Sequence, residues 1–353
     1  MALTINTNMS SLIAQRSLGK ATTGMNTSIE RLTTGYKINH SKDNAAGYSI
    51  ANIWDTQISS LDVAADNAAT GMDLLTTAEE TYGLLSDHLR RVRDLTEQAA
   101  NGTYGSQSLT AIQAEVYARL QEISRISANS EFNGIKLMAF NLDKDGNEIV
   151  GTNDKVGITA SGINLQVGLY ADENSIINLN IKCFSNASVS GLFYNLREKT
   201  SINGSNVELQ NIYKKAANNV EYKFNSKEGM NAFAAACCGL VMTEYKSNTD
   251  TATMKLQTDK DYGAKEMLSF LDMAIDDISA RATKIGAAQN RVESAITALD
   301  VQSQNITSSL STLRDTDVAE ESSTYIQQQI LQQASATLLS TANQLPSIAL
   351  NLI

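Results

Sequence analysis

Proline is almost absent from this sequence of 353 residues, and aromatic residues are scarce. There is one proline, where average usage predicts about 5% of residues, so little interrupts a long helix. Aromatic residues make up 6%. No stretch approaches the ~20 consecutive apolar residues of a membrane span, and the start "MALTINTNMSSLIAQRSLGK" lacks the basic and apolar regions of a signal peptide. We therefore expect neither a membrane anchor nor cleavable export.

Positive charge and cysteine are also in short supply. Lys and Arg number 28 against 38 Asp and Glu, a net charge of −10, which excludes a general nucleic-acid binder because phosphate binding needs clustered cations. The cysteines are three, Cys183, Cys237 and Cys238, an odd set with two adjacent members. Such a set makes a poor disulfide framework or zinc site, so we interpret all three as reduced packing residues.

Apolar residues at heptad spacing are what the sequence has in abundance. Steps of three and four residues alternate over roughly 70 Å of helix in the C-terminal third, which indicates one narrow seam facing a partner helix. The positions are Leu268, Leu271, Ile275, Ile278, Ala282, Ile285, Gln289, Val292, Ile296, Leu299, Ser303, Ile306, Leu310 and Leu313. A matching seam runs from Trp54 to Ala99, and we expect that helix to end at "AANGT" with Asn101 and Gly102 in a left-handed cap.

A third helix and then β-structure follow the first seam. The helix is predicted by Leu109, Ile112, Val116, Leu120, Ile123 and Ile126, and Asn133-Gly134 favours a type I′ hairpin turn. Between about 139 and 261, runs such as "INLQVGLYA" and "SIINLNIKC" predict strands, with one helix at "GMNAFAAACCGLVMTEY". We expect a mainly α fold with a small mixed α/β insert: a long antiparallel helical bundle around a β-hairpin-containing central region.

The two ends carry thinner apolar stripes. One comprises Met9, Leu12, Leu18, Ala21, Met25, Ile29 and Leu32, and the other Ile326, Ile330, Ala334, Leu338, Ala342 and Leu345. Both stripes are amphipathic and rich in polar neighbours, so each helix would be marginal alone. We expect these ends to find an intermolecular partner.

Several sequence blocks together resemble one family closely. They include "INTNMSSLIAQRSLGKATTGMNTSIERLTTGYKIN", "KDNAAGYSIA", "LRRVRDLTEQAANGT", "IQAEVYARLQEISRIS", "EFNGIKLM", "IGAAQNRVESAI" and "QILQQASATLLSTANQLP". In this order they cover roughly the first 138 and the last 90 residues. The sequence resembles bacterial flagellin, the subunit of the flagellar filament, although its middle matches only weakly, at "INLQVGLYADENSI".

The resemblance implies an arrangement in layers. Residues 1–40 and 315–353 would pair as the inner coiled coil of a hollow filament, residues 41–138 and 262–314 would form the arms of the bundle, and residues 139–261 would project outward. The inner coiled-coil residues would be Leu18, Met25, Ile29, Leu32, Ile330, Leu338 and Leu345.

The resemblance also implies a role for the segment Arg31–Ala51, as the connector that contacts neighbouring subunits. Gly35 and Gly47 suit backbone turns, while Lys37, Lys42 and Asp43 can pair across subunits; Asn39 belongs to the same set. We interpret His40 as a solvated or interfacial residue, since no second histidine or cysteine lies near it.

The family pattern further implies an epitope for the innate immune receptor toll-like receptor 5 at Arg91, Leu95 and Glu115. A spacing of four puts Arg91 and Leu95 on one helix face, and Glu115 would lie on the adjacent antiparallel helix. We expect that face to exist for subunit contacts, with receptor binding secondary to it.

Partners and location follow from the resemblance as well. They are other copies of the chain in a homopolymer, an export chaperone at the C-terminal helix, and the filament cap and hook-filament junction proteins, all serving a secreted, extracellular filament used for motility. Some flagellins carry a zinc protease in the insert, but His40 and His88 both lie outside it, so we expect no enzyme, metal or cofactor. The alternative is a hook-filament junction protein; the ending "LLSTANQLP" fits a filament subunit better.

Overall fold

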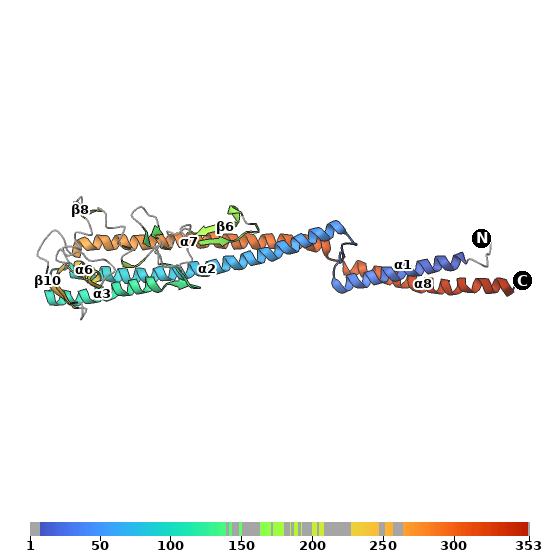
Figure 1. The fold of residues 1–353 in the computed structure, drawn as a ribbon, viewed down its shortest axis with the longest axis horizontal. Helices are drawn as coiled ribbons and strands as arrows, with labels where there is room; N and C mark the ends of the chain where they lie inside the picture. The colour runs from blue at the N-terminus through green and yellow to red at the C-terminus, as the bar shows by residue number, and fades with distance from the viewer. Residues whose placement is uncertain are drawn as a thin grey trace. The chain divides into compact units, whose positions relative to one another are not determined.

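Helices dominate the computed structural model. It describes residues 8–138, 141–142, 148–149, 163–170, 172–179, 184, 187–189, 192, 200–202, 205–207, 227–246, 251–256 and 264–351. Within these residues the long helices are α1 (Met9–Thr34), α2 (Ala45–Ala99), α3 (Ser106–Asn129), α7 (Ala264–Arg314) and α8 (Val318–Asn351) (Figure 1). A shorter helix, α6 (Lys227–Cys237), belongs to the central region. The predicted mainly α fold is confirmed.

The chain divides into two compact units. Residues 1–63 and 299–353 form the first unit, and residues 64–298 form the second. The divisions fall inside α2 and α7, because both helices are continuous across them. The sequence predicts domain boundaries elsewhere, near residues 40 and 315, close to the ends of α1 and α7. Those domain boundaries stay predictions.

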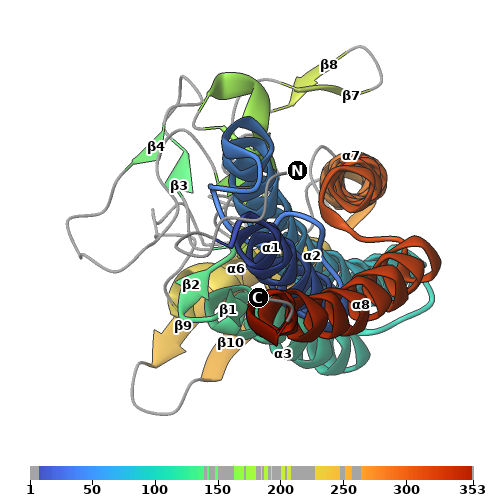
Figure 2. The same ribbon diagram turned by 90° about the vertical axis from the view of Figure 1, so that its right-hand side faces the viewer.

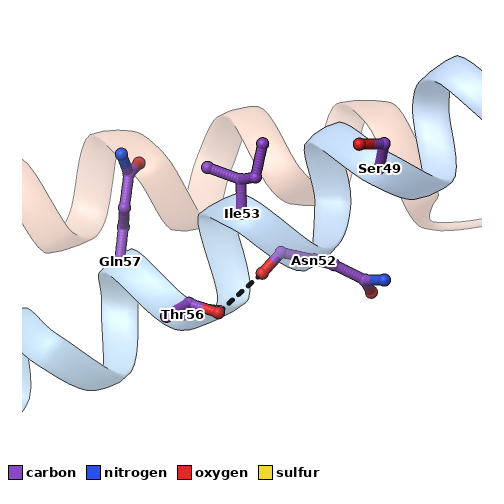
Figure 3. Close-up of a pocket in the computed structure, with 5 residues that line it drawn as sticks. All are labelled: Ser49, Asn52, Ile53, Thr56 and Gln57. Atoms are coloured by element: carbon purple, nitrogen blue, oxygen red, sulfur yellow. Dashed lines mark hydrogen bonds between the residues drawn. The ribbon is translucent and has the colours of Figure 1, made fainter.

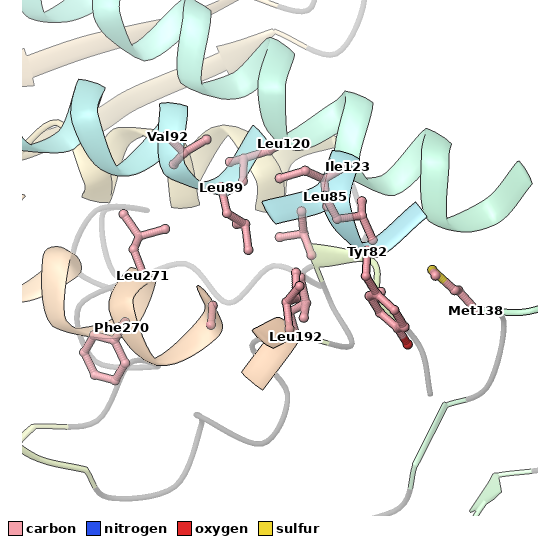
Figure 4. Close-up of a cluster of buried hydrophobic side chains, with 14 of the residues drawn as sticks. Tyr82, Leu85, Leu89, Val92, Leu120, Ile123, Met138, Leu192, Phe270 and Leu271 are labelled. Atoms are coloured by element: carbon pink, nitrogen blue, oxygen red, sulfur yellow. The ribbon is translucent and has the colours of Figure 1, made fainter. Parts of the chain in front are cut away.

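The second unit has a large apolar core at the predicted heptad positions (Figure 4). Leu271, Ile278, Ile285 and Val292 repeat every seven residues along α7 and are buried. Facing them from α2 and α3 are the buried side chains of Tyr82, Leu85, Leu89, Val92, Val116, Leu120 and Ile123. Large side chains thus fill this unit from within, which is the main source of its stability.

The sequence predicts two turns, of which the turn at Asn133-Gly134 is correct and the turn after α2 is only partly correct. Asn133 and Gly134 have φ values of 48° and 79°, and they join β1 (Glu131–Phe132) to β2 (Ile135–Lys136) as predicted. Helix α2 also ends where predicted, but Asn101 and Gly102 do not adopt the left-handed conformation. The Asn101 N–H donates to Gln98 O at 3.2 Å instead. A right-handed turn satisfies the chain there, so the left-handed cap is not needed.

The central region contains short antiparallel pairs. They are β3 (Asn141–Leu142) with β4 (Glu148–Ile149), β5 (Ile163–Gln166) with β6 (Ile176–Leu179), β7 (Thr200–Ile202) with β8 (Ser205–Val207), and β9 (Leu240–Lys246) with β10 (Thr251–Leu256). The pair β5–β6 matches the predicted strands "INLQVGLYA" and "SIINLNIKC".

The helix predicted at "GMNAFAAACCGLVMTEY" is right only in its first half. Helix α6 ends at Cys237, and Gly239 has a φ of 65°, which a residue with a side chain seldom adopts. The chain then leaves as strand β9. Cys237 and Cys238 are free and buried, and burial raises the pKa of the Cys237 thiol to about 12, so that thiol is protonated at neutral pH. Cys183 lies outside the described residues.

Two glycines inside α2 should respond in opposite ways to alanine. Gly83 has open space around a built Cβ, so Gly83→Ala should stabilise the second unit by about 0.5–1 kcal/mol through helix propensity. A Cβ at Gly71 would overlap the Leu165 side chain of β5, so Gly71→Ala should lose that gain. Thermal unfolding of both variants measures the difference. Equal stabilisation by both would show that β5 does not pack on α2.

Candidate assembly site

Helices α1 and α8 lie side by side and run antiparallel (Figures 1 and 2). Their register is fixed at both ends. Near one end, the Asn8 side-chain amide donates to Ala342 O at 2.7 Å. Near the other, Arg31 Nη1 lies 3.4 Å from Glu321 Oε2. Residues that face each other across the pair therefore have numbers that add up to about 350.

Small side chains form the interface of this pair. We call it the terminal seam: Ala14, Ala21 and Ser28 of α1, and Ser335 and Ala342 of α8, all buried and spaced by multiples of seven. Glu321, also buried, continues the α8 repeat at the end where it pairs with Arg31. Between the two helices, a Cβ built on Gly24 would come within 2.9 Å of Gln328 Cδ. Small residues let two helix backbones approach closely, and close approach leaves no room for large side chains between them.

The residues predicted for the inner coiled coil lie outside the terminal seam, and their role in assembly stays a prediction. Leu18, Met25 and Leu32 are only half-buried. Ile29, Ile330 and Leu338 are exposed, and the side chain of Leu345 lies outside the described residues. The apolar periodicity of the two ends correctly predicted helices α1 and α8. It did not reveal that the small residues, rather than the large ones, face each other.

Large apolar side chains are consequently left in water. Eight of them, between 43% and 62% exposed, are spread over the outward sides of the two helices, and we call this set the terminal apolar face: Met9, Leu12, Ile13 and Ile29 of α1, and Ile326, Ile330, Leu331 and Leu338 of α8. Exposed apolar residues gathered on one pair of helices mark an interaction surface.

The connector after α1 is tied to the link between α7 and α8. Gly35 has a φ of 76° and closes α1, as predicted. Its carbonyl accepts from Thr316 N–H at 2.9 Å, and Lys37 N–H donates to Arg314 O at 2.7 Å. The Arg314 guanidinium lies 4.0 Å from the centre of the Tyr36 ring and 2.8 Å from Asp55 Oδ2. These contacts tie the connector to the link between α7 and α8 within the first unit.

Most of the predicted connector contacts are made within the chain itself. Lys37 Nζ donates to Thr312 O at 2.9 Å, and the Asn39 amide donates to Tyr36 O at 3.0 Å. Asp43 accepts the N–H groups of His40 and Asn39, and these hydrogen bonds, with the His40 bond first, lower the pKa of its carboxyl. The three charged residues predicted to pair across subunits are all exposed, and among the described residues Lys42 is the one of the three that makes no hydrogen bond or ion pair.

Gly47 has a different role from the one predicted, and His40 makes a specific contact. Gly47 lies in α2 rather than in a turn, and a Cβ there would come within 2.8 Å of Ile38 Cδ1, so close packing explains the glycine. His40 Nε2 lies 2.7 Å from Glu30 Oε1 on α1.

A shallow depression lies on the first turns of α2 (Figure 3). Its volume is about 420 Å³, and it is lined by Ser49, Asn52, Ile53, Thr56 and Gln57. These side chains supply hydroxyl, amide and aliphatic groups, with no acid or base among them. In the described part of the chain, no three His, Cys, Asp or Glu side chains gather as a metal site, and no described helix is long and apolar enough to cross a bilayer.

The three residues assigned to the receptor epitope do not share one surface. Arg91 on α2 and Glu115 on α3 are exposed and joined by an ion pair of 2.9 Å, which confirms that the two helices are neighbours. Arg119 Nη2 lies 3.9 Å from the same carboxylate. Leu95 is only 2% exposed and belongs to the core of the second unit. The expectation that Arg91 and Leu95 share an accessible face is wrong, because more than one flank of α2 is covered by other helices.

These features define a class: a helical subunit that is stable through one core and carries a separate apolar surface for assembly. Comparison with models of known protein families identifies the family. Residues 5–141 match the bacterial flagellin N-terminal helical region, and residues 268–353 match the bacterial flagellin C-terminal helical region.

Two Vibrio flagellins align with this chain over their whole length. Polar flagellin F of Vibrio parahaemolyticus is 33% identical over 380 residues, and flagellin B of Vibrio cholerae is 33% identical over 383 residues; both alignments span 100% of each chain. A crystal structure of Bacillus cereus flagellin aligns with 66% of this chain and 88% of its own, at 19% identity and a TM-score of 0.38. The chain belongs to the bacterial flagellins and is a structural subunit of the flagellar filament.

The burial of Leu95 predicts a contrast with its neighbour. Leu95→Ala should lower the free energy of unfolding of the second unit by about 2–5 kcal/mol, because it leaves a cavity in the core. Arg91→Ala removes one exposed ion pair and should change it by less than about 1 kcal/mol. Thermal or denaturant unfolding of both variants is the measurement. Similar stability of the two would place Leu95 at the surface after all.

Proposed function

We propose that this chain polymerises into a hollow helical filament through its terminal apolar face, and that the filament serves motility. One observation carries the proposal: large apolar side chains stay exposed on a helix pair whose own seam is already filled by small residues. Nothing within that pair can cover them without separating α1 from α8. Other copies of the same chain carry the same face and are the partner that a homopolymer supplies.

The gain from covering this face is large enough to drive assembly. Each of its side chains is roughly half exposed, so burying one stabilises the polymer by on the order of 1–2 kcal/mol. A subunit that buries several of them gains enough to offset the freedom lost on association. Lys42, exposed in the connector, would contact a neighbouring copy beside this face.

Placing charge on the terminal apolar face should stop assembly and leave the subunit folded. Ile330→Glu with Leu338→Glu puts two carboxylates at positions that are 59% and 62% exposed, so the subunit itself loses little stability. Inside a polymer the same carboxylates would be buried without partners. We expect no filaments by electron microscopy.

The matched control adds the same charge elsewhere on α8. Gln333→Glu with Ser340→Glu changes two exposed positions that lie outside the terminal apolar face. This control should still polymerise. Filaments from the Ile330→Glu, Leu338→Glu chain would refute the proposed contact, whereas loss of assembly in both chains would show that charge anywhere on α8 is harmful.

Electron microscopy of the unaltered chain also addresses the hook-filament junction alternative. A filament subunit forms long tubes, whereas a junction protein assembles as a short ring. The same exposed face explains the other proposed partners. An export chaperone would cover α8 before secretion, and the cap and junction proteins would meet the polymer ends through the terminal helices.

We also propose a secondary role as a ligand of toll-like receptor 5, with the contact limited to the exposed pair Arg91 and Glu115. The pair supports this role because a guanidinium and a carboxylate held 2.9 Å apart present a fixed, charged recognition feature. Leu95 would act from beneath, by packing α2 in place.

Adjacent arginines allow a specific test of this surface. Arg91→Ala should weaken receptor binding by about tenfold or more, as arginines at the centre of interfaces often do. Arg90→Ala removes an exposed arginine whose nearest carboxylate, on Asp87, lies 3.8 Å away, and it should bind as the unaltered chain does. Receptor binding by surface plasmon resonance compares the two. Unchanged binding by Arg91→Ala would exclude the pair from the receptor contact.

A further inference from the structure

Charged residues on the terminal helices are few and unevenly placed. Helix α8 has none after Glu321, although it continues to Asn351. On α1 the charged residues are Arg16, Lys20, Glu30 and Arg31. Arg31 pairs with Glu321, and Glu30 pairs with His40. Arg16 and Lys20 are exposed, and among the described residues neither has a hydrogen bond or an ion pair.

Two carboxylates at the start of α8 are also exposed. Asp317 caps the helix, with Oδ1 accepting from Ala319 N–H at 2.8 Å, and its other oxygen remains for a second partner. Glu320 has no ion pair among the described residues. Two exposed cations therefore lie on α1, and two exposed anions lie at the start of α8.

The helix register gives the distance between these groups along the pair. Arg31 is level with Glu321, and Gly24 is level with Gln328. Glu320 is then level with about residue 32 of α1, and Asp317 with about residue 35. Arg16 is thus 16 residues along α1 from the level of Glu320, and Lys20 is 15 residues from the level of Asp317. At 1.5 Å per residue, both offsets come to roughly 23 Å.

Such an offset excludes pairing within one chain but suits two copies. A single sliding displacement of roughly 23 Å between neighbouring helix pairs brings Arg16 level with Glu320 and Lys20 level with Asp317 together. The terminal apolar face spans roughly 30 Å between the levels of Met9 and Ile29, so after that displacement its two ends still overlap. Met9, Leu12 and Ile13 of one copy then come level with Ile29 and Ile326 of the other.

The charges also lie within the surface proposed to make contact. Arg16 is three and four residues after Ile13 and Leu12, so the three share one side of α1. Glu320 precedes Leu331 and Leu338 by close to three and five whole turns, so it shares their side of α8. Contacts between copies that bury these apolar residues would also bring the charges against a neighbour.

We propose that Arg16 and Lys20 of one copy pair with Glu320 and Asp317 of a second copy, and that these pairs set the axial register of the polymer. The inference rests on the proposed function, because it needs copies that assemble through the terminal helices. The apolar contacts supply most of the assembly free energy but slide easily past one another. Charges at matching intervals select one displacement and penalise the others.

A double-mutant cycle on the full chain tests the Arg16–Glu320 pair. Arg16→Glu and Glu320→Arg should each raise the critical concentration for polymerisation about tenfold, since each places like charges together. The chain with both changes restores an opposite pair and should return to within about threefold of the unaltered chain. An equimolar mixture of the two single variants should assemble better than either alone. Sedimentation measures polymer, and circular dichroism confirms that each subunit is folded.

The controls separate this pairing from the assembly itself. Lys284→Glu makes the same charge change at an exposed position on α7 and should leave the critical concentration unchanged. The deficit of the single variants should shrink at high salt, because exposed charges are screened within about 8 Å at physiological ionic strength. Additive losses in the double variant, or single variants that assemble normally, would overturn the pairing alone. Failure of the unaltered chain to form filaments would overturn both the pairing and the proposed function.

Discussion

The close approach of α1 and α8 through small residues is the constraint on which the rest of the account depends. Ala21 and Ser28 on one helix, with Ser335 and Ala342 on the other, bring the two backbones together and leave no space for a leucine or isoleucine between them. Every large apolar side chain of the pair must then lie at its edges or face outward. The exposure of the large apolar side chains is the direct result of how this pair packs on itself.

In the second unit, by contrast, the large apolar side chains are buried. Leu85, Leu89, Val116, Leu120 and Ile285 are fully buried, so the large side chains meet each other inside the chain. A core of this kind stabilises the unit without any partner. One polypeptide thus combines a part whose large apolar side chains are buried with a part whose large apolar side chains are exposed. The connector that follows α1 is hydrogen-bonded to the link that precedes α8, for example through Lys37 N–H to Arg314 O. These backbone hydrogen bonds hold α1 and α8 in register.

Sequence periodicity predicted the parts of the fold in which large residues face inward. The seven-residue repeat from Leu271 to Val292 is buried as expected, and the Asn133-Gly134 turn follows from local backbone preference alone. The terminal seam was missed because a heptad of alanine and serine is weaker in hydrophobicity than the leucines beside it. Ala14, Ala21 and Ser28 could have been found by searching for small residues at heptad spacing.

The remaining errors concern tertiary contacts that no local pattern contains. Leu95 lies four residues after an exposed arginine, but neighbouring helices bury it. The sequence favours Gly47 as a turn residue, yet Ile38 leaves it no room for a side chain. The most direct test is the structure of the assembled polymer by electron cryo-microscopy. The account predicts that Ala21 and Ser28 still face α8 of the same copy, while Ile330 and Leu338 are buried against other copies. Ile330 and Leu338 facing solvent in the polymer, or α1 and α8 of one copy separated, would contradict it.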